Sequence, residues 1–190
     1  LTAFPVIFLL NYLFYGLKFS DLSYAQTVAL ALFCAHFIKR ELETLFVHKF
    51  SNGYMPLFNI FKNTTYYTGC AYYIAYYVLH PQYTSPPDQW VNIWAVIVVL
   101  NMIGNLICHI ILSNLRPPGT TVRNIPRGFL FEFVSCPNYT FEIAMWFAYS
   151  MMSKTVAGFV FTVFGGGQML IWAIKKHQNY RKEFKDYPRG

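Results

Sequence analysis

The stretch of sequence that decides the fold runs from Asn105 to Glu142. Its polar residues are concentrated in five short segments: Asn105-Leu-Ile-Cys-His109, Leu115-Arg-Pro-Pro-Gly119, Arg123-Asn-Ile-Pro-Arg127, Ser135-Cys-Pro-Asn-Tyr139 and Phe141-Glu142. A strongly apolar segment ends here in a loop punctuated by Pro and Gly. A second apolar segment then opens with Pro-Asn-Tyr and carries a glutamate one turn in. Polar residues at such a membrane-like boundary are costly unless they are used, so we interpret this stretch as the active-site side of a membrane enzyme.

The composition is that of a membrane protein rather than of a water-soluble domain. The 190 residues are 55% hydrophobic and 20% aromatic, and only 12% are charged, whereas about 25% is usual for soluble domains. No internal repeat or low-complexity tract is visible, so residues 1–190 are predicted to form a single domain. The sequence begins at Leu1 and shows no secretory leader, so we expect a domain that belongs to a longer protein.

The apolar residues fall into six stretches, which we place at 3–17, 22–38, 64–79, 90–112, 139–153 and 155–174. A helix that crosses a bilayer needs roughly 17–25 residues. The expected fold class is therefore all-α, a polytopic membrane helix bundle of about six transmembrane helices. The alternative, buried helices of a soluble protein, is disfavoured because the charged surface of such a protein is missing.

Positive charge is distributed unevenly between the predicted loops. When the N-terminus is placed in the cytoplasm and the loops alternate, thirteen of the fifteen Lys and Arg residues lie on the cytoplasmic side, and only Lys18 and Lys154 lie on the other. Such a bias is the usual sign of membrane orientation, so we predict that both ends are cytoplasmic. The bias also accounts for the net charge of +7, and nucleic acid is not expected as a partner.

Several kinds of site are not supported by the residue spacing. The four cysteines form no CxxC pair and are expected to be free thiols. No HExxH or Gly-x-Ser-x-Gly motif occurs, so neither a metal site nor a hydrolase is predicted. The run Gly165-Gly-Gly167 lacks the context of a phosphate loop, and we expect it to serve close helix packing instead.

Polar residues inside the apolar segments indicate where a site lies. Asn101, Asn105 and His109 are four residues apart and so share one helical face, which in a membrane bundle normally points inward. An interhelical hydrogen bond is the alternative for each of them. For Arg40 and Glu43 two interpretations stay open. They stabilise each other on a solvated face, or they point into a polar pocket at the cytoplasmic mouth.

The loop and the C-terminal tail together predict an anion site. The loop carries three arginines, whose planar guanidinium groups suit phosphate: Arg116, Arg123 and Arg127. The basic tail from Lys175 to Gly190 either contacts anionic lipid or closes over a polyanionic ligand. The acid–base candidates inside the bundle are Tyr139, Glu142, His109 and Glu43.

These segments resemble the C-terminal catalytic domain of the steroid 5α-reductase family. The resemblance is carried by Leu115-Arg-Pro-Pro-Gly119, Ile125-Pro-Arg-Gly128, Leu130-Phe-Glu-Phe-Val134, Pro137-Asn-Tyr139, Phe141-Glu142, Lys176-His-x-x-Tyr180, Glu183-Phe184 and Asp186-Tyr-Pro188. Within the family, the sequence is most similar to the trans-2,3-enoyl-CoA reductase branch, through Leu42-Glu-Thr-Leu-Phe-Val-His48, Met55-Pro56, Asn59-Ile-Phe-Lys-Asn63 and Ser135-Cys-Pro-Asn-Tyr139.

The resemblance implies a multi-pass protein of the endoplasmic reticulum membrane with its active site toward the cytosol. It implies that NADPH is used to reduce a carbon–carbon double bond conjugated to a carbonyl. In this branch the substrate is a long-chain trans-2-enoyl-CoA, reduced in very-long-chain fatty acid elongation, which also supplies sphingolipid metabolism. Membrane lipids and the other elongation enzymes are the implied partners. The alternatives are a sterol or polyprenol reductase of the same family and a non-enzymatic membrane scaffold.

The resemblance also assigns roles to individual residues. The implied cofactor contacts are Asn105, Arg116, Arg123, Asn138, Glu142, His177 and Tyr180, of which Arg123 is the weakest transfer. Steroid reductases are thought to pair a tyrosine with a glutamate, but here Arg40 stands around that place. We therefore take Tyr139 as the proton donor, with Glu43 as the second catalytic candidate. A phenol at Tyr139 without a chemical role is the alternative.

Overall fold

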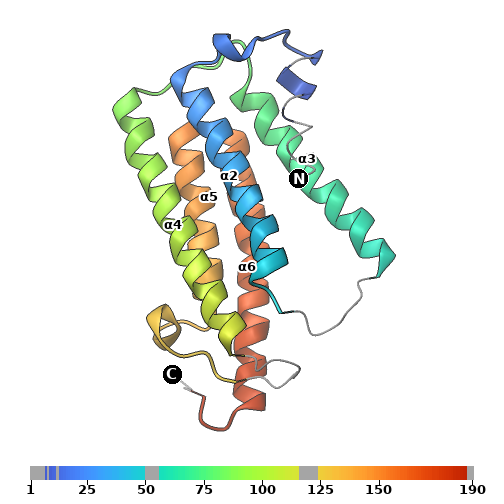
Figure 1. The fold of residues 1–190 in the computed structure, drawn as a ribbon, viewed down its shortest axis with the longest axis vertical. Helices are drawn as coiled ribbons and strands as arrows, with labels where there is room; N and C mark the ends of the chain where they lie inside the picture. Colours follow the sequence, from blue (N-terminus) through green and yellow to red (C-terminus); the bar gives the residue numbers. More distant parts are fainter. Residues whose placement is uncertain (1–6, 8, 12, 50–55, 116–123, 188–190) are drawn as a thin grey trace.

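Long antiparallel helices dominate the computed structural model, which describes residues 7, 9–11, 13–49, 56–115 and 124–187 (Figure 1). The helices are α2 (Tyr24–Phe46), α3 (Leu57–Val78), α4 (Asp88–Asn114), α5 (Pro137–Ser153) and α6 (Val156–Glu183). Two short 3-10 turns, η1 (Phe19–Asp21) and η2 (Phe129–Glu132), complete the described elements, and no strand occurs among these residues. The all-α prediction is confirmed for this part of the chain.

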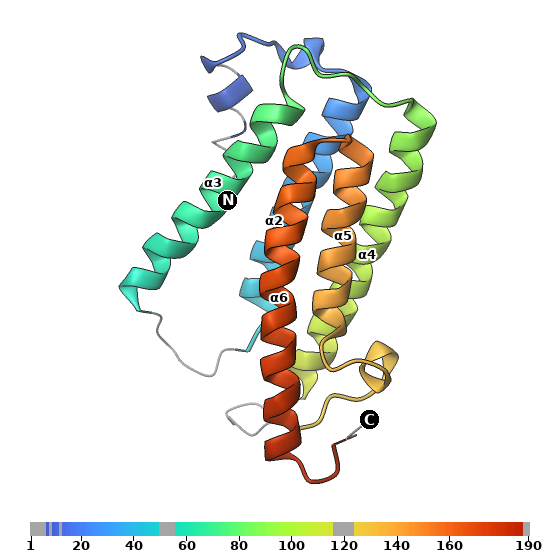
Figure 2. The same cartoon turned by 180° about the vertical axis from the view of Figure 1, so that it is seen from behind.

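The helices form a bundle from which one member leans away. α2, α4, α5 and α6 run side by side, whereas α3 meets them only near its C-terminal end and diverges at the other (Figures 1 and 2). α4 packs most extensively against α5, and α5 packs against α6. The lower end of α3 therefore leaves its apolar side chains exposed, among them Leu57, Phe58 and Phe61, as expected of a surface that faces lipid.

Local sequence explains where several helices begin. Ser23 caps α2 by accepting from the backbone N–H of Gln26, and the side chain of Gln26 accepts from the backbone N–H of Ser23. α5 begins at Pro137, since proline fits the first helical turn. Thr155 caps α6 by accepting from the N–H of Gly158 at 3.3 Å.

Three helices extend well beyond their apolar stretches, by more than one helical turn at one end. α2 continues through charged sequence to Phe46, and α6 continues through the basic tail to Glu183. α3 begins at Leu57 rather than at 64. For α2 and α6 the apolar stretch ended before the helix, because a helix continues into charged sequence when its residues are good helix formers. The stretch 3–17 lies partly outside the described residues.

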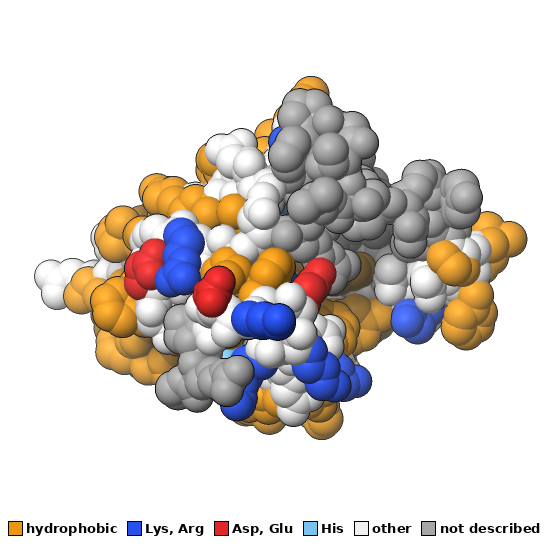
Figure 3. All heavy atoms as spheres, turned by 90° about the horizontal axis from the view of Figure 1, so that it is seen from below, with side chains coloured by type: hydrophobic (Ala, Val, Ile, Leu, Met, Phe, Trp, Pro, Cys, Tyr) orange, Lys and Arg blue, Asp and Glu red, His pale blue; other side chains and the backbone are white. Residues whose placement is uncertain are grey.

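Two helices, α4 and α6, are long and apolar enough to cross a membrane. This supports a membrane protein, while the number of six spans and the cytoplasmic orientation stay predictions. Lys and Arg side chains gather on the end of the bundle where α2, α4 and α6 finish (Figure 3). The candidate site lies inside this end.

Close helix packing uses other glycines than the predicted ones. A Cβ on Gly104 would lie 2.5 Å from the ring of Phe141, so the glycine in α4 makes room for this ring of α5. At Gly158 a Cβ would lie 2.8 Å from Ser150 Oγ. The prediction for Gly165 to Gly167 was wrong, because two of these face open space and Gly166 meets Ile143 only at ordinary contact distance.

Candidate functional site

Two cavities meet inside the basic end of the bundle. The larger has a volume of about 590 Å³, and its polar wall includes Lys49, Lys175, Lys176, Asn179 and Tyr180. The smaller has a volume of about 300 Å³, and its wall combines polar side chains with aromatic and apolar ones that the larger cavity lacks, namely Phe37, Tyr67, Trp146, Phe161 and Met169. Five residues belong to both walls: Arg40, His109, Asn138, Tyr139 and Trp172. The two cavities therefore form one site with a cationic half and an aromatic half.

The buried carboxylate of Glu43 organises the wall between α2 and α4. Its side chain is only 1% exposed, and its oxygens lie 2.7 Å from Lys39 Nζ and 3.0 Å from Arg40 Nη1. His109 Nδ1 from α4 lies 3.1 Å from the same carboxylate. Each of the two interpretations of Arg40 and Glu43 holds in part: the two side chains pair at 3.0 Å, and Arg40 but not Glu43 faces the cavities. Glu43 itself is not among the residues that line either cavity.

The proton on His109 decides how this network is connected. Nδ1 of His109 lies within contact of Glu43 and also 3.3 Å from Arg40 Nη1. A protonated Nδ1 donates to Glu43, whereas an unprotonated Nδ1 accepts from Arg40. Arg40 and His109 line both cavities. The position of the proton on His109 therefore changes which N–H groups of these two residues are available to a ligand.

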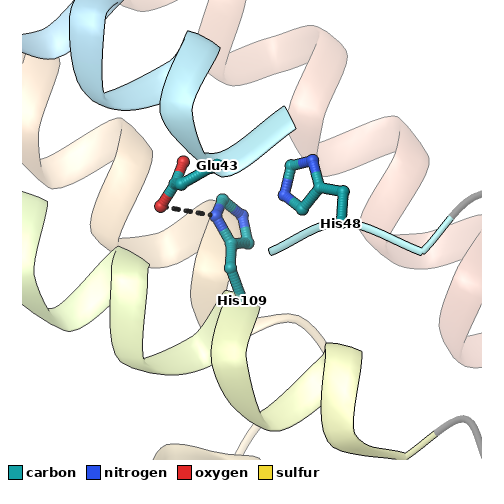
Figure 4. Close-up of side chains that lie close together, drawn as sticks. All are labelled: Glu43, His48 and His109. Carbon is teal, nitrogen blue, oxygen red and sulfur yellow. Dashed lines mark ion pairs between the residues drawn. The ribbon is translucent and has the colours of Figure 1, made fainter. Parts of the chain in front are cut away.

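Glu43, His48 and His109 also form a group of potential metal ligands (Figure 4). One ligand atom from each lies within 4.8 Å of the others, although no metal-ligand spacing is visible in the sequence. Lys39 and Arg40 already compensate the charge of Glu43, so the group offers a cation no uncompensated negative charge. We interpret the group as part of an ion-pair network rather than as a metal centre.

Asn105, a predicted cofactor contact, has both ends of its amide engaged within the protein. Its Oδ1 accepts from Lys39 Nζ at 2.6 Å, and its Nδ2 donates to the backbone carbonyl of Asn138 at 2.9 Å. The side chain is buried at 2% exposure and joins α2, α4 and α5. Asn105 lines the smaller cavity, but both of its hydrogen bonds go to the protein, so it holds Lys39 and the start of α5 in place.

Asn138 and Tyr139 lie in the first turn of α5, where both line both cavities. Asn138 Oδ1 is buried and has no hydrogen-bond partner in the described part of the chain. An unsatisfied buried acceptor costs roughly 1–3 kcal/mol, so this atom indicates a place where a ligand donates. Tyr139 is half-buried, and its ring centroid lies 6.4 Å from that of Trp172.

Glu142 lies one turn deeper, where it meets two residues that were not predicted. His36 Nε2 lies 3.3 Å from its carboxylate, and Trp146 Nε1 donates to it at 3.2 Å. His36 Nδ1 is buried without a partner among the described residues. The signal for His36 was present in the sequence, because His36, Arg40 and Glu43 recur at the spacing of one helical face.

The predicted residues of the tail lie close to the larger cavity. Tyr180 is buried and lines it, whereas His177 faces Ser135, with Ser135 Oγ 2.7 Å from His177 Nδ1. Lys176 Nζ lies 5.7 Å from the ring centroid of Tyr180, a cation–π contact that holds the amine beside the cavity.

The predicted arginines divide into two groups. Arg116 and Arg123 lie outside the described residues, although Leu115 and Asn124, which flank that segment, both line the larger cavity. Arg127 pairs with Glu132 at 3.4 Å in an exposed contact and is not among the residues that line either cavity.

Comparison with known proteins places these features in a family. A family model described as 3-oxo-5-alpha-steroid 4-dehydrogenase matches residues 53–190. The chain is 50% identical over 191 residues to the very-long-chain enoyl-CoA reductase of Dictyostelium discoideum, covering 100% of the chain and 63% of that protein. It is 42% identical over 200 residues to the probable very-long-chain enoyl-CoA reductase of Caenorhabditis elegans, covering 100% of the chain and 65% of that protein.

A more distant relative is named for a different substrate. The 3-oxo-5-alpha-steroid 4-dehydrogenase 1 of Rattus norvegicus is 33% identical over 173 residues, covering 86% of the chain and 64% of that protein. The chain thus spans a little less than two thirds of the length of each of these three relatives.

Proposed function

Because the chain belongs to the 3-oxo-5-alpha-steroid 4-dehydrogenase family, we propose that it is an NADPH-dependent enoyl-CoA reductase. It would saturate the 2,3 double bond of a long-chain trans-2-enoyl-CoA during very-long-chain fatty acid elongation at the endoplasmic reticulum membrane. The similarity to the very-long-chain enoyl-CoA reductases of Dictyostelium discoideum and Caenorhabditis elegans supports this acceptor. The observation that carries the proposal is the junction of a cationic and an aromatic cavity at Tyr139.

The residues present fit a phosphorylated dinucleotide. Pockets for small ligands and cofactors typically measure about 300–1,000 Å³, and the larger cavity lies within this range. Lys49, Lys175 and Lys176 would hold phosphates, while the unpartnered Oδ1 of Asn138 and the carboxylate of Glu142 would accept from the N–H groups of the cofactor. When bound, NADPH supplies the hydride that reduces the β-carbon of the substrate.

Tyr139 is the proposed proton donor to the α-carbon. Its phenol stands where the two cavities join, so it reaches a substrate that extends from one into the other. The reduction adds a hydride at the β-carbon and a proton at the α-carbon. Negative charge develops on the thioester oxygen between these events, and donors already in place stabilise it. Arg40 and His109, which line both cavities, are the donors that we assign to this task.

Glu43 acts through its partners rather than on the substrate. It holds Arg40 and His109 at 3.0 and 3.1 Å but does not line either cavity, so we revise its role from catalysis to positioning. The aromatic cavity, with Phe37, Phe161 and Met169 in its wall, would take the first part of the acyl chain. The cationic cavity would also suit the phosphates of coenzyme A.

The test is NADPH oxidation by the purified full-length protein with a long-chain trans-2-enoyl-CoA. Tyr139→Phe should reduce turnover about a hundredfold or more, the usual contribution of a positioned acid, while NADPH still binds. Tyr149→Phe is the matched control, because its hydroxyl donates to the carbonyl of Ala29 within the core. Equal turnover in the wild type and Tyr139→Phe would remove Tyr139 from the chemistry.

One alternative acceptor has specific support. The similarity to a steroid 4-dehydrogenase favours a sterol or polyprenol as the second candidate. A protein that binds NADPH but does not turn over enoyl-CoA would support this alternative. A protein that does not bind NADPH would contradict the reductase proposal and leave a membrane scaffold.

A further inference from the structure

The turn η2 and the residues that flank it expose apolar side chains at the basic end of the bundle. Phe133 is 82% exposed, and Phe129 and Val134 are 45% and 43% exposed. A single exposed ring needs no explanation. Three exposed apolar side chains within residues 129–134 form a patch, and such patches mark contacts with proteins or membranes. We call residues 127–134 the η2 segment.

The η2 segment is folded back beside α4 (Figure 1). The ring of Phe129 stacks on that of Phe141, with the centroids 5.6 Å apart and the planes 12° apart. The ring of Phe141 in turn occupies the space that Gly104 leaves open. Gly104 lies ten residues before Asn114, the last residue of α4, which corresponds to about 15 Å along the helix axis. The stacked rings therefore lie beside the apolar part of α4 rather than beyond its end.

The surface of α4 at this level is apolar as well. Ile103, Ile107 and Ile110 recur at helical spacing around the same turns, and all three are exposed. α4 is one of the two helices that are long and apolar enough to cross a membrane. The η2 segment thus adds exposed apolar side chains at a level where α4 itself presents an apolar surface.

The η2 segment pairs much of its own backbone. The N–H groups of Phe133 and Val134 both donate to the carbonyl of Leu130 at 3.1 Å. The N–H of Gly128 donates to Glu132 Oε1 at 2.6 Å. Backbone donors without partners are costly in contact with lipid, so these hydrogen bonds suit a segment that is partly withdrawn from water.

Two further features fit the border between water and lipid. Arg127 Nη1 donates to Glu132 Oε2 at 3.4 Å, so the two charges of the segment compensate each other. Phe129 has a φ of +50°, a conformation that a bulky residue keeps only where its surroundings impose it. The stack on Phe141 is a contact that holds this conformation.

We propose that the η2 segment inserts Phe133 and Val134 into the phospholipid bilayer at the basic end of the bundle, between the headgroups and the upper acyl carbons. Lipid fits this surface better than a protein partner does. The segment lies beside a membrane-capable helix, compensates its own charges and pairs its own backbone donors. Short apolar segments of this kind bind at the headgroup–acyl boundary by burying apolar area there.

The insertion would set the depth of the candidate site. α5 begins at Pro137, directly after the η2 segment and its short connection, and carries Asn138 and Tyr139 in its first turn. A segment held at the interface therefore holds these two side chains at a constant depth in the bilayer. This inference goes beyond the proposed reductase activity and does not depend on it.

The experiment reads the depth of position 133 by tryptophan fluorescence. Full-length Phe133→Trp is reconstituted in phosphatidylcholine bilayers whose acyl chains carry bromine, a quencher, either near the headgroup or near the chain end. The emission of the wild type is subtracted. Because Phe133 is 82% exposed, this substitution should not disturb folding. We expect the added emission to be quenched more strongly by bromine near the headgroup.

Two matched variants calibrate the depth. Ile103→Trp lies near the middle of the apolar part of α4 and should be quenched more strongly by bromine near the chain end. Lys182→Trp lies in the exposed last turn of α6 and should be quenched by neither lipid. A Phe133→Trp signal that behaves like that of Lys182→Trp would overturn the insertion. Emission shifted to the blue but quenched by neither lipid would mean that a second copy or another protein covers Phe133, and would equally overturn it.

A second substitution tests whether the aromatic stack places the segment. Phe129→Ala, introduced into the Phe133→Trp protein, removes the stack on Phe141 and should abolish the preference for bromine near the headgroup. Phe147→Ala is the control, because it removes another ring of α5, one that meets Phe159 in α6. An unchanged quenching profile in Phe129→Ala would overturn the placement of the segment by this stack.

Discussion

Asn105 Nδ2 donates a hydrogen bond to the backbone carbonyl of Asn138 at 2.9 Å. The sequence analysis implied that both asparagines contact the cofactor. The structure gives them different environments. The amide of Asn105 accepts a hydrogen bond from Lys39 and donates one to the backbone of α5. Asn138 is thereby fixed in the first turn of α5, and its own Oδ1 is left buried without a partner among the described residues.

Substitution of Asn138 should therefore affect mainly cofactor binding, and substitution of Asn105 should affect mainly stability. Asn138→Ala removes an acceptor that has no internal partner, so thermal stability should change little while the Kd for NADPH rises roughly tenfold. Asn105→Ala breaks two hydrogen bonds and should destabilise the protein by about 1–3 kcal/mol. Thermal unfolding in detergent and NADPH titration would be measured on both variants. A larger loss of stability in Asn138→Ala than in Asn105→Ala would contradict this division of roles.

Glu43→Gln should be among the most destabilising changes that preserve side-chain shape. It leaves Lys39 and Arg40 without their counter-charge in a site where the carboxylate is only 1% exposed. Removing one partner of a buried ion pair costs about 3–5 kcal/mol, which thermal unfolding would detect. The control is Glu132→Gln, because the pair of Glu132 with Arg127 is exposed and such pairs contribute little. Equal melting temperatures of the two variants would mean that Glu43 does not hold this wall together.

Gly104→Ala should separate α4 from α5 and so disturb the support of Asn105, the next residue. The added methyl group would lie 2.5 Å from the ring of Phe141, and such overpacking costs about 1–3 kcal/mol. Gly165→Ala is the matched control on α6, where no atom lies within 4 Å. That change should stabilise the helix by about 0.5–1 kcal/mol. The prediction fails if both substitutions shift the melting temperature in the same direction.

The size of the aromatic cavity should set how much of the acyl chain it accepts. Met169→Trp adds bulk to its wall, so turnover of long-chain enoyl-CoA should fall several-fold more than turnover of a short-chain substrate, because added volume excludes the longer chain. Leu170→Trp serves as the control, since Leu170 is 58% exposed. Steady-state rates over a series of chain lengths would test this. An equal loss at every length in Met169→Trp would place the acyl chain elsewhere.

The sequence predicted the residues of the site better than it predicted their roles. The spacing of Asn105 and His109 correctly indicated an inward face of α4, because helical periodicity is a local property. The same spacing could not show that Lys39 reaches Asn105 from another helix, nor that Glu43 lies behind the cavity wall. His36 was missed although it shares a helical face with Arg40 and Glu43, because its partner Glu142, 3.3 Å away, lies on another helix.

What the sequence determined by itself was the class of protein and the family. Low charge, long apolar stretches and the motifs between Asn105 and Glu142 were sufficient for this, because helix formation and membrane preference depend on composition and local pattern. Only the tertiary structure decided which polar groups face one another. It alone showed that two cavities join at Tyr139 and that Tyr187 reaches His177 through Ser135. Such contacts join residues far apart in the chain, and their distances depend on how the helices pack.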